Sequence, residues 1–195
     1  MTMPVPVRTP KNETRKTEAG KNGKPTAPIA DPQLLTELEI ASGLRNDKPA
    51  APIADRQALI DGLNRDLAGE YQAIIMYTHY SAKLTGPYRR ELRALFQAEI
   101  ADEQGHAQFL SDKIAAMGGE PTTEPKPVPH VGQPREMLDH ALAAEKQAIV
   151  DYTARTKQAE ACGDIGLKVN LESQIADETR HKEELERIIA GWDDR

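Results

Sequence analysis

The sequence of 195 residues predicts an all-α protein whose main domain is a four-helix bundle, built from two helical hairpins joined by a long crossover. Its composition is typical of helices, because Ala, Leu, Glu, Gln and Lys are plentiful while aromatic residues make up only 4%. Two stretches of the chain read alike 75 residues apart, and a proline-rich segment lies between them. We therefore expect one hairpin from each half.

The first hairpin is predicted over residues 56–117. Apolar residues recur with a helical period over 56–84, and Asp55 stands where an N-cap is expected. The run Thr85-Gly86-Pro87 ends this helix, because proline cannot continue it. A second helix follows over 88–117 and stops at two consecutive glycines.

The crossover is predicted over residues 120–134, which contain five prolines and cannot be helical. About fifteen extended residues reach roughly 50 Å, whereas a helix of about 28 residues is roughly 42 Å long. The segment can therefore run the length of the bundle, which leaves the second and third helices parallel. The third helix is predicted over 134–161, and the fourth follows a Cys162-Gly163-Asp164 turn and ends near Ala190.

Residues 1–55 are predicted to form a flexible arm rich in proline and lysine, because they hold eight of the fourteen prolines and show no sustained periodicity. The bundle then occupies residues 56–195. The first 24 residues carry six Lys or Arg against two Glu, although the whole chain has a net charge of −6. Such a basic tip suits contact with an anionic partner such as DNA.

The single cysteine, Cys162, excludes an internal disulfide and a Cys-x-x-Cys metal module. A reducing compartment is therefore expected. The sequence has no apolar run of membrane-spanning length and nothing that resembles a signal peptide. We expect a soluble cytoplasmic protein with no membrane partner.

Each half supplies one lone glutamate and, 33 residues later, a Glu-x-x-His motif. Residues three apart share a helix face, so the Glu and His of each motif can bind one metal ion together. Each histidine and one terminal glutamate would serve one metal ion, and the other two carboxylates would bridge both. The predicted ligands are Glu70, Glu103, His106, Glu145, Glu178 and His181.

Two iron ions are the expected metals, with manganese as the alternative, because the ligands are oxygen and imidazole without thiolate. One Glu-x-x-His motif is usually no more than a solvated helix face, but two copies at matched spacing are hard to explain that way. Four buried carboxylates without a cation would also repel one another.

Further residues are expected around these ligands. Tyr77 and Tyr152 each lie seven residues after a lone glutamate and are the candidate catalytic residues. Either could hydrogen-bond a ligand carboxylate or pass an electron to the metals, and simple packing remains an equal alternative. Asp102 and Asp177 could accept the outer imidazole N–H of the histidines. Glu99 is expected to be a plain exposed glutamate.

With these residues in place, the chain resembles the ferritin-like superfamily, and most of all bacterioferritin, over residues 56–190. The six predicted ligands stand at the places of the bacterioferritin ferroxidase ligands, and Tyr77 matches a tyrosine near that centre. The resemblance implies a homo-oligomer that oxidises ferrous iron with oxygen or peroxide, for iron storage or detoxification. No haem is expected, because Gln104 replaces the haem-ligating methionine of that family.

Two alternatives stay open. A di-iron hydroxylase or a manganese catalase uses the same ligand set, and the fold does not separate these activities. The second alternative is a non-enzymatic ferritin-like protein that protects DNA or is cargo of a shell. Residues 38–45 resemble the type of peptide that docks ferritin-like cargo into encapsulin shells, which makes the arm a candidate contact for such a partner.

Overall fold

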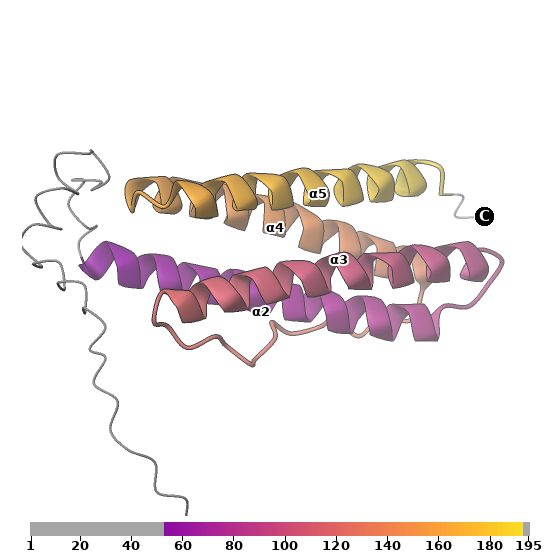
Figure 1. Cartoon of the computed structure of the whole chain (residues 1–195). Helices are drawn as coiled ribbons and strands as arrows, with labels where there is room; N and C mark the ends of the chain where they lie inside the picture. Colours follow the sequence, from indigo (N-terminus) through magenta and orange to yellow (C-terminus); the bar gives the residue numbers. More distant parts are fainter. Residues whose placement is uncertain (1–52, 193–195) are drawn as a thin grey trace, which may run out of the picture. The chain divides into compact units, whose positions relative to one another are not determined.

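The structure, a computed structural model, describes residues 53–192. The four helices are α2 (Ile53–Lys83), α3 (Arg89–Ala116), α4 (Pro134–Ala161) and α5 (Ile165–Ala190). They form one bundle, shown in Figure 1, and the described residues contain no strand. The predicted all-α fold is therefore confirmed. The predictions for the flexible arm, its DNA contact and its shell-docking peptide concern residues outside the described part of the chain.

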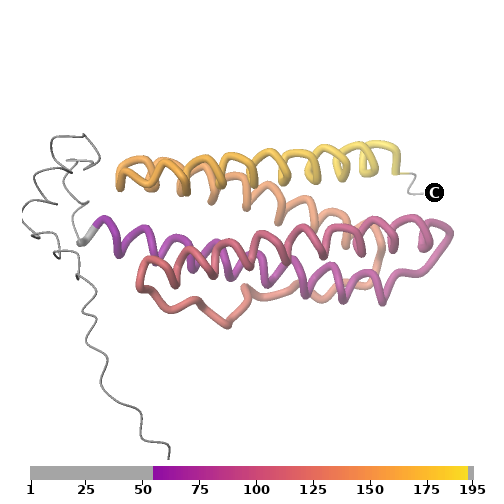
Figure 2. The backbone as a smooth tube through the Cα atoms, in the orientation of Figure 1, coloured from indigo at the N-terminus to yellow at the C-terminus, as the bar shows by residue number. Residues whose placement is uncertain are grey.

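The two hairpins pack as the repeat predicts, since α2 contacts α3 and α4 contacts α5 most extensively. A smaller interface between α2 and α4 joins the hairpins. The trace in Figure 2 shows α3 and α4 running in the same direction, with the crossover running back along the bundle beside α2. This confirms the parallel arrangement that the length of the crossover predicted.

Helix α2 begins at Ile53, so Asp55 lies in its first turn. The prediction that Asp55 is the N-cap is therefore wrong, although an acidic side chain in the first turn still interacts favourably with the helix dipole. Helix α5 does begin as predicted, because the Asp164 side chain accepts a hydrogen bond from the backbone N–H of Leu167 at 3.0 Å. The preceding Gly163 has a φ of +75°, a left-handed conformation that glycine adopts without strain.

The crossover is attached to α2 along its length. Asn64 donates a hydrogen bond to the carbonyl of Glu120 at 3.1 Å and accepts one from the backbone N–H of Thr122 at 2.7 Å. Further along, the backbone N–H of Lys126 donates to the carbonyl of Ala68 at 2.8 Å. The Tyr80 hydroxyl donates to the carbonyl of Pro129, and the Lys83 ammonium donates to the carbonyl of Val131, each also at 2.8 Å. Side chains of α2 thus satisfy backbone groups that the proline-rich segment cannot pair within itself.

The apolar core consists of two clusters, one toward each end of the bundle. One cluster includes Leu63, Leu110 and Leu171, and the other includes Phe96 and Met137. In every helix the predicted ligands fall between the residues of these two clusters. The bundle therefore holds a polar layer between two apolar ones.

None of the helices within residues 53–192 combines the length and the continuous apolar character needed to cross a membrane.

The attachment of the crossover can be tested at Asn64. We expect Asn64→Ala to lower the free energy of unfolding by about 1 kcal/mol, because it removes two hydrogen bonds that hold the crossover on α2. Chemical denaturation followed by circular dichroism measures this loss. The control is Gln57→Ala, which removes a hydrogen bond between two exposed side chains of α2, those of Gln57 and Asp61. Equal, small losses in both variants would contradict this account.

Candidate metal centre

The structure brings the six predicted ligands together at the middle of the bundle. One glutamate comes from α2, a Glu-x-x-His pair from α3, one glutamate from α4 and a second Glu-x-x-His pair from α5. Each of the six is buried, with no residue more than 7% exposed. The two hairpins therefore meet at a layer of four carboxylates and two imidazoles.

These residues form two groups that share two members. Glu70 and His106 lie in one group, Glu145 and His181 in the other, and Glu103 and Glu178 belong to both. Within each group, one ligand atom from each residue lies within 4.8 Å of the others. Glu103 and Glu178 thus lie where carboxylates bridging two metal ions would be, while Glu70 and Glu145 lie where terminal ligands would be.

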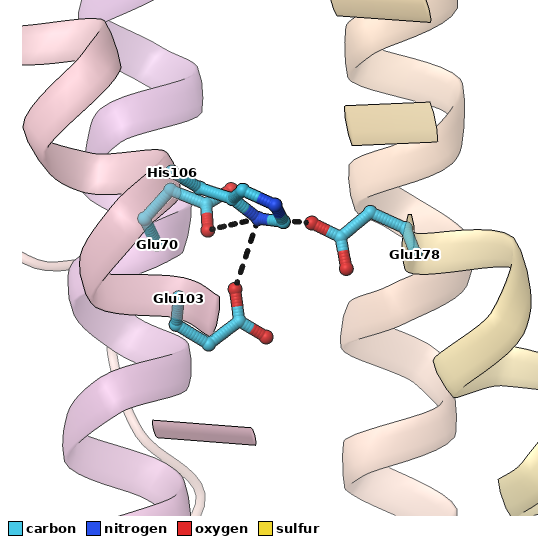
Figure 3. A group of neighbouring side chains, drawn as sticks. All are labelled: Glu70, Glu103, His106 and Glu178. Atoms are coloured by element: carbon cyan, nitrogen blue, oxygen red, sulfur yellow. Dashed lines mark ion pairs between the residues drawn. The ribbon is translucent and has the colours of Figure 1, made fainter. Parts of the chain in front are cut away.

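In the first group the His106 ring lies between the two hairpins, as Figure 3 shows. Its Nδ1 atom is 2.9 Å from Oε1 of Glu178, 3.6 Å from Oε2 of Glu103 and 3.7 Å from Oε2 of Glu70. In the second group, Nδ1 of His181 is 3.2 Å from Oε2 of Glu178 and 3.9 Å from Oε2 of Glu145. The same ring atom of each histidine therefore faces the carboxylates.

Several atoms that face one another here make no hydrogen bond, although they are buried. They are Oε2 of Glu70, both carboxylate oxygens of Glu178, and the Nδ1 atoms of His106 and His181. Buried polar atoms without a partner are costly and uncommon in proteins. Because all are electron-pair donors when the imidazoles are neutral, cations between them would satisfy them together. The residues present therefore fit a pair of metal ions with oxygen and imidazole ligands.

The protonation of the metal-free site follows from burial and neighbouring charges. Burial, together with the adjacent carboxylates, holds the pKa values of Glu103 and Glu145 well above the usual range. Although burial opposes charge on the imidazoles, contacts with the surrounding glutamates raise the pKa of His106 to about 12 and that of His181 to about 10. Without metal, two protonated rings thus supply the positive charge, and metal binding must release those protons.

Glu178 differs from the other glutamates of the site. Although burial opposes its ionisation, the adjacent imidazole rings of His106 and His181 lower its pKa to about 2. It is also fully buried. In contrast to Glu103 and Glu145, Glu178 therefore ionises readily, and it lies between both histidines.

The two tyrosines bond across the hairpins. The Tyr77 hydroxyl of α2 donates to Oε1 of Glu145 on α4, and the Tyr152 hydroxyl of α4 donates to Oε1 of Glu70 on α2 at 2.5 Å. Burial, with the neighbouring carboxylates, raises the pKa of both phenols well above the usual range. Both phenols therefore stay protonated and fix the orientation of the two terminal carboxylates.

An ion pair beside the site was not predicted. Arg155 donates to both carboxylate oxygens of Asp66, at 2.7 and 3.2 Å, and both residues are buried. Asp66 precedes Glu70 by four residues and Arg155 follows Tyr152 by three, so helical spacing places them on the ligand-bearing faces. A Cβ atom at Gly62 would overlap the Arg155 guanidinium, which explains a glycine inside α2.

The outer nitrogens of the two histidines have different partners. Nε2 of His181 lies 2.8 Å from Oε2 of Glu99 and 3.3 Å from Oδ2 of Asp102, whereas Nε2 of His106 lies 3.8 Å from Oδ2 of Asp177. Each aspartate faces the histidine of the other hairpin. The prediction that Glu99 is a plain exposed glutamate is wrong, because its side chain is only 16% exposed and contacts His181.

A cavity of about 60 Å³ reaches the carboxylate layer between α2 and α4. Its lining includes all four glutamates of the site and Lys126 of the crossover. The Lys126 ammonium is 3.2 Å from Oδ2 of Asp151 on α4. The cavity has room for small molecules only.

Comparison with known proteins agrees with this arrangement. The profile of the ferritin-like domain matches residues 60–193. A bacterioferritin from Desulfovibrio desulfuricans is 30% identical over 131 residues, which are 67% of this chain and 73% of that protein. A bacterioferritin from Rhodobacter capsulatus is 29% identical over 136 residues, which are 69% of this chain and 84% of that protein.

A solved structure of a ferritin-like, diiron-carboxylate protein from Bacillus anthracis is also similar. It has a TM-score of 0.68 and 50% sequence identity, and the match covers 69% of this chain and 97% of that chain.

The contribution of the buried ion pair between Arg155 and Asp66 to stability can be tested. We expect Arg155→Met to lower the free energy of unfolding by about 3–5 kcal/mol at neutral pH, because it leaves the Asp66 carboxylate buried without its cation. The loss should shrink at acidic pH, since burial already raises the pKa of Asp66 and protonation removes the unpaired charge. Denaturation of Arg155→Met and of the double variant Asp66→Leu/Arg155→Met measures both effects, and the double variant should recover most of the loss. A double variant less stable than the single one would refute this explanation.

A second prediction concerns the metal-free protein and Glu103. Its raised pKa means that the folded state keeps a proton that the unfolded state releases near the usual value of 4.5. Stability is therefore lost as pH rises toward the folded-state value, and Glu103→Gln, which cannot ionise, should be the more stable protein at the upper end of that interval. Thermal unfolding of chelator-treated protein at several pH values measures this difference. Glu183→Gln, an exposed change on α5, should show no such trend, and a Glu103→Gln curve parallel to wild type would count against the assignment.

Proposed function

Because this chain belongs to the ferritin-like superfamily and is a protein of the bacterioferritin type, we propose that it is a ferroxidase that oxidises ferrous to ferric iron at an intrachain two-metal site. The observation that carries the proposal is the pair of ligand groups sharing Glu103 and Glu178, with their buried, unbonded donor atoms. Iron storage or detoxification is the role that such an activity serves.

The substrate is a pair of ferrous ions. One would be held by Glu70, His106 and the shared carboxylates, and the other by Glu145, His181 and the same shared carboxylates. Binding releases the protons that His106 and His181 carry at Nδ1 in the metal-free protein. Each ferrous ion gives up one electron, and the two electrons with two protons convert dioxygen to hydrogen peroxide, or hydrogen peroxide to water.

The residues of the site keep the two iron ions close together while each changes from the ferrous to the ferric state. Tyr77 and Tyr152 hold the terminal carboxylates by hydrogen bonds from the opposite hairpin, which makes them positioning residues in this proposal. That either tyrosine passes an electron to the metals is part of the same proposal. Burial of the whole layer excludes bulk water and strengthens each electrostatic contact.

The size of the cavity favours a small oxidant over an organic substrate. A hydroxylase needs a pocket beside the metals that admits an organic substrate, but the cavity that reaches these carboxylates measures about 60 Å³. A manganese catalase would use a small substrate as well, so metal analysis of the freshly purified protein separates the two. The absence of haem stays a prediction that rests on Gln104, which is exposed on α3.

We also propose that the chain forms a homo-oligomer. Several large apolar side chains are exposed on the bundle, among them Ile75 at 45%, Val150 at 60% and Val169 at 57%. A second copy of the chain could bury them. The mass of the protein in solution tests this proposal. Cytoplasmic location, DNA contact and shell docking remain predictions from the sequence.

The ferroxidase proposal is tested by removing ligands. We expect Glu103→Ala and His181→Ala to lower the rate of ferrous iron oxidation at least about tenfold, because even partners of metal ligands affect affinity or activity by 10–100-fold. Stopped-flow absorbance of ferric product measures the rate, and circular dichroism shows that the fold is retained. Glu183→Ala removes an exposed carboxylate of the same helix as His181 and should oxidise iron like wild type. Unchanged rates in both ligand variants would reject the proposal.

A further inference from the structure

The two metal positions have matching ligands but different surroundings. Each has one terminal glutamate, one histidine facing inward through Nδ1, one tyrosine donor on the terminal glutamate, and the same two shared carboxylates. From these groups alone, both positions should bind a divalent cation equally well. The repeat of 75 residues makes the comparison direct, because each group has an equivalent in the other hairpin.

The equivalence ends at the outer nitrogens of the histidines. Glu99 of α3 places Oε2 at 2.8 Å from Nε2 of His181. The repeat-equivalent residue on α5 is Gln174, which carries no charge. Gln174 is buried, at 6% exposure, and its Oε1 atom has no hydrogen-bond partner among the described residues. His106 therefore lacks the close carboxylate that His181 has.

The neighbouring aspartates increase this difference. Asp102 lies 3.3 Å from Nε2 of His181, whereas its equivalent Asp177 lies 3.8 Å from Nε2 of His106. Arg180 donates to Asp177 at 2.8 Å and to Asp102 at 3.4 Å, so it competes most strongly for the carboxylate that faces His106. Its Nη2 atom also lies 3.3 Å from Nε2 of His181. The Glu99 carboxylate at 2.8 Å is therefore the nearest charged group to Nε2 of His181, and His106 has no carboxylate at such a distance.

A carboxylate that accepts the outer N–H of a ligand histidine fixes its tautomer and ring orientation and makes its other nitrogen a better donor to a metal ion. The negative charge of Glu99 also lies close to the second position and attracts a cation through partly buried, weakly screened surroundings.

We propose that the two positions differ in affinity, that the position of Glu145 and His181 binds a divalent cation first, and that Glu99 is the positioning residue responsible. The inference rests on the proposed two-metal site. It predicts ordered loading, in which the position of Glu70 and His106 fills only at higher metal concentration. The second ion then exchanges more readily than the first.

The test is a titration of metal-free protein with Co²⁺ under anaerobic conditions, followed by calorimetry and by the visible absorbance of bound cobalt. Wild type should bind two ions in two separate steps. Glu99→Gln removes the close carboxylate from His181 and should weaken the tight step about 10–100-fold while leaving the weak step unchanged. Gln174→Glu should tighten the weak step by a similar factor.

The double variant Glu99→Gln/Gln174→Glu separates an electrostatic and orienting role from a merely structural one. It keeps the total charge and should move the tight step from one position to the other. To identify which position binds tightly, Glu70→Ala and Glu145→Ala are each introduced into wild type and into the double variant. The substitution that abolishes the tight step marks the position responsible for it. Glu183→Gln is the control for loss of one acidic charge on an exposed surface and should leave both steps unchanged.

The outcomes distinguish this inference from the proposed function. Two bound ions with equal affinity, or a Glu99→Gln variant in which both steps weaken alike or neither weakens, would overturn the inference and leave the two-metal site standing. Failure of wild type to bind any pair of ions would overturn the proposed function itself.

Discussion

The constraint on which the rest of this structure depends is the burial of four carboxylates and two imidazoles in one layer of an apolar bundle. Such groups repel one another and lose hydration, so the layer is stable only when positive charge compensates it. In the metal-free protein, protons on His106 and His181 supply that charge, which is why their pKa values rise while that of Glu178 falls. Two metal ions would replace those protons at the same place.

The bundle around this layer keeps the ligands in place. Apolar clusters on both sides prevent the helices from sliding, because each cluster takes residues from all four helices. Hydrogen bonds from Tyr77 and Tyr152 tie each hairpin to a glutamate of the other, and the pair of Asp66 and Arg155 does the same one turn away. The crossover contacts both hairpins beside the cavity, because Lys126 bonds to Ala68 of α2 and to Asp151 of α4. The polar layer is therefore held by contacts between the hairpins and by the crossover.

The internal repeat gives the two proposed metal positions nearly equivalent ligands, and in our proposal a small departure from the repeat makes their affinities different. Glu99 and Gln174 have equivalent places in the two hairpins, yet only one of them carries a charge. For a protein of the bacterioferritin type, an ordered pair of positions suits a reaction in which iron is both bound and released. One ion can stay while the other exchanges.

The sequence by itself determined the all-α fold, the two hairpins and the parallel relation imposed by the long crossover, because these follow from helical period, spacing and chain length. The same spacing selected six residues that the structure brings together, and their role as metal ligands is part of our proposal. It placed the start of the first helix wrongly at Asp55 and misjudged Glu99, since neither local propensity nor spacing reports what packs against a side chain.

Only the tertiary structure decided which glutamates are shared, since Glu103 and Glu178 are distinguished from Glu70 and Glu145 by distances between helices. It also decided the tyrosine bonds across the hairpins and the burial of Arg155 against Asp66, which join residues 68 to 89 positions apart in the chain. The physical reason is the same in each case. Period along one helix selects the face on which a residue lies, but the partner it meets depends on how separate helices pack.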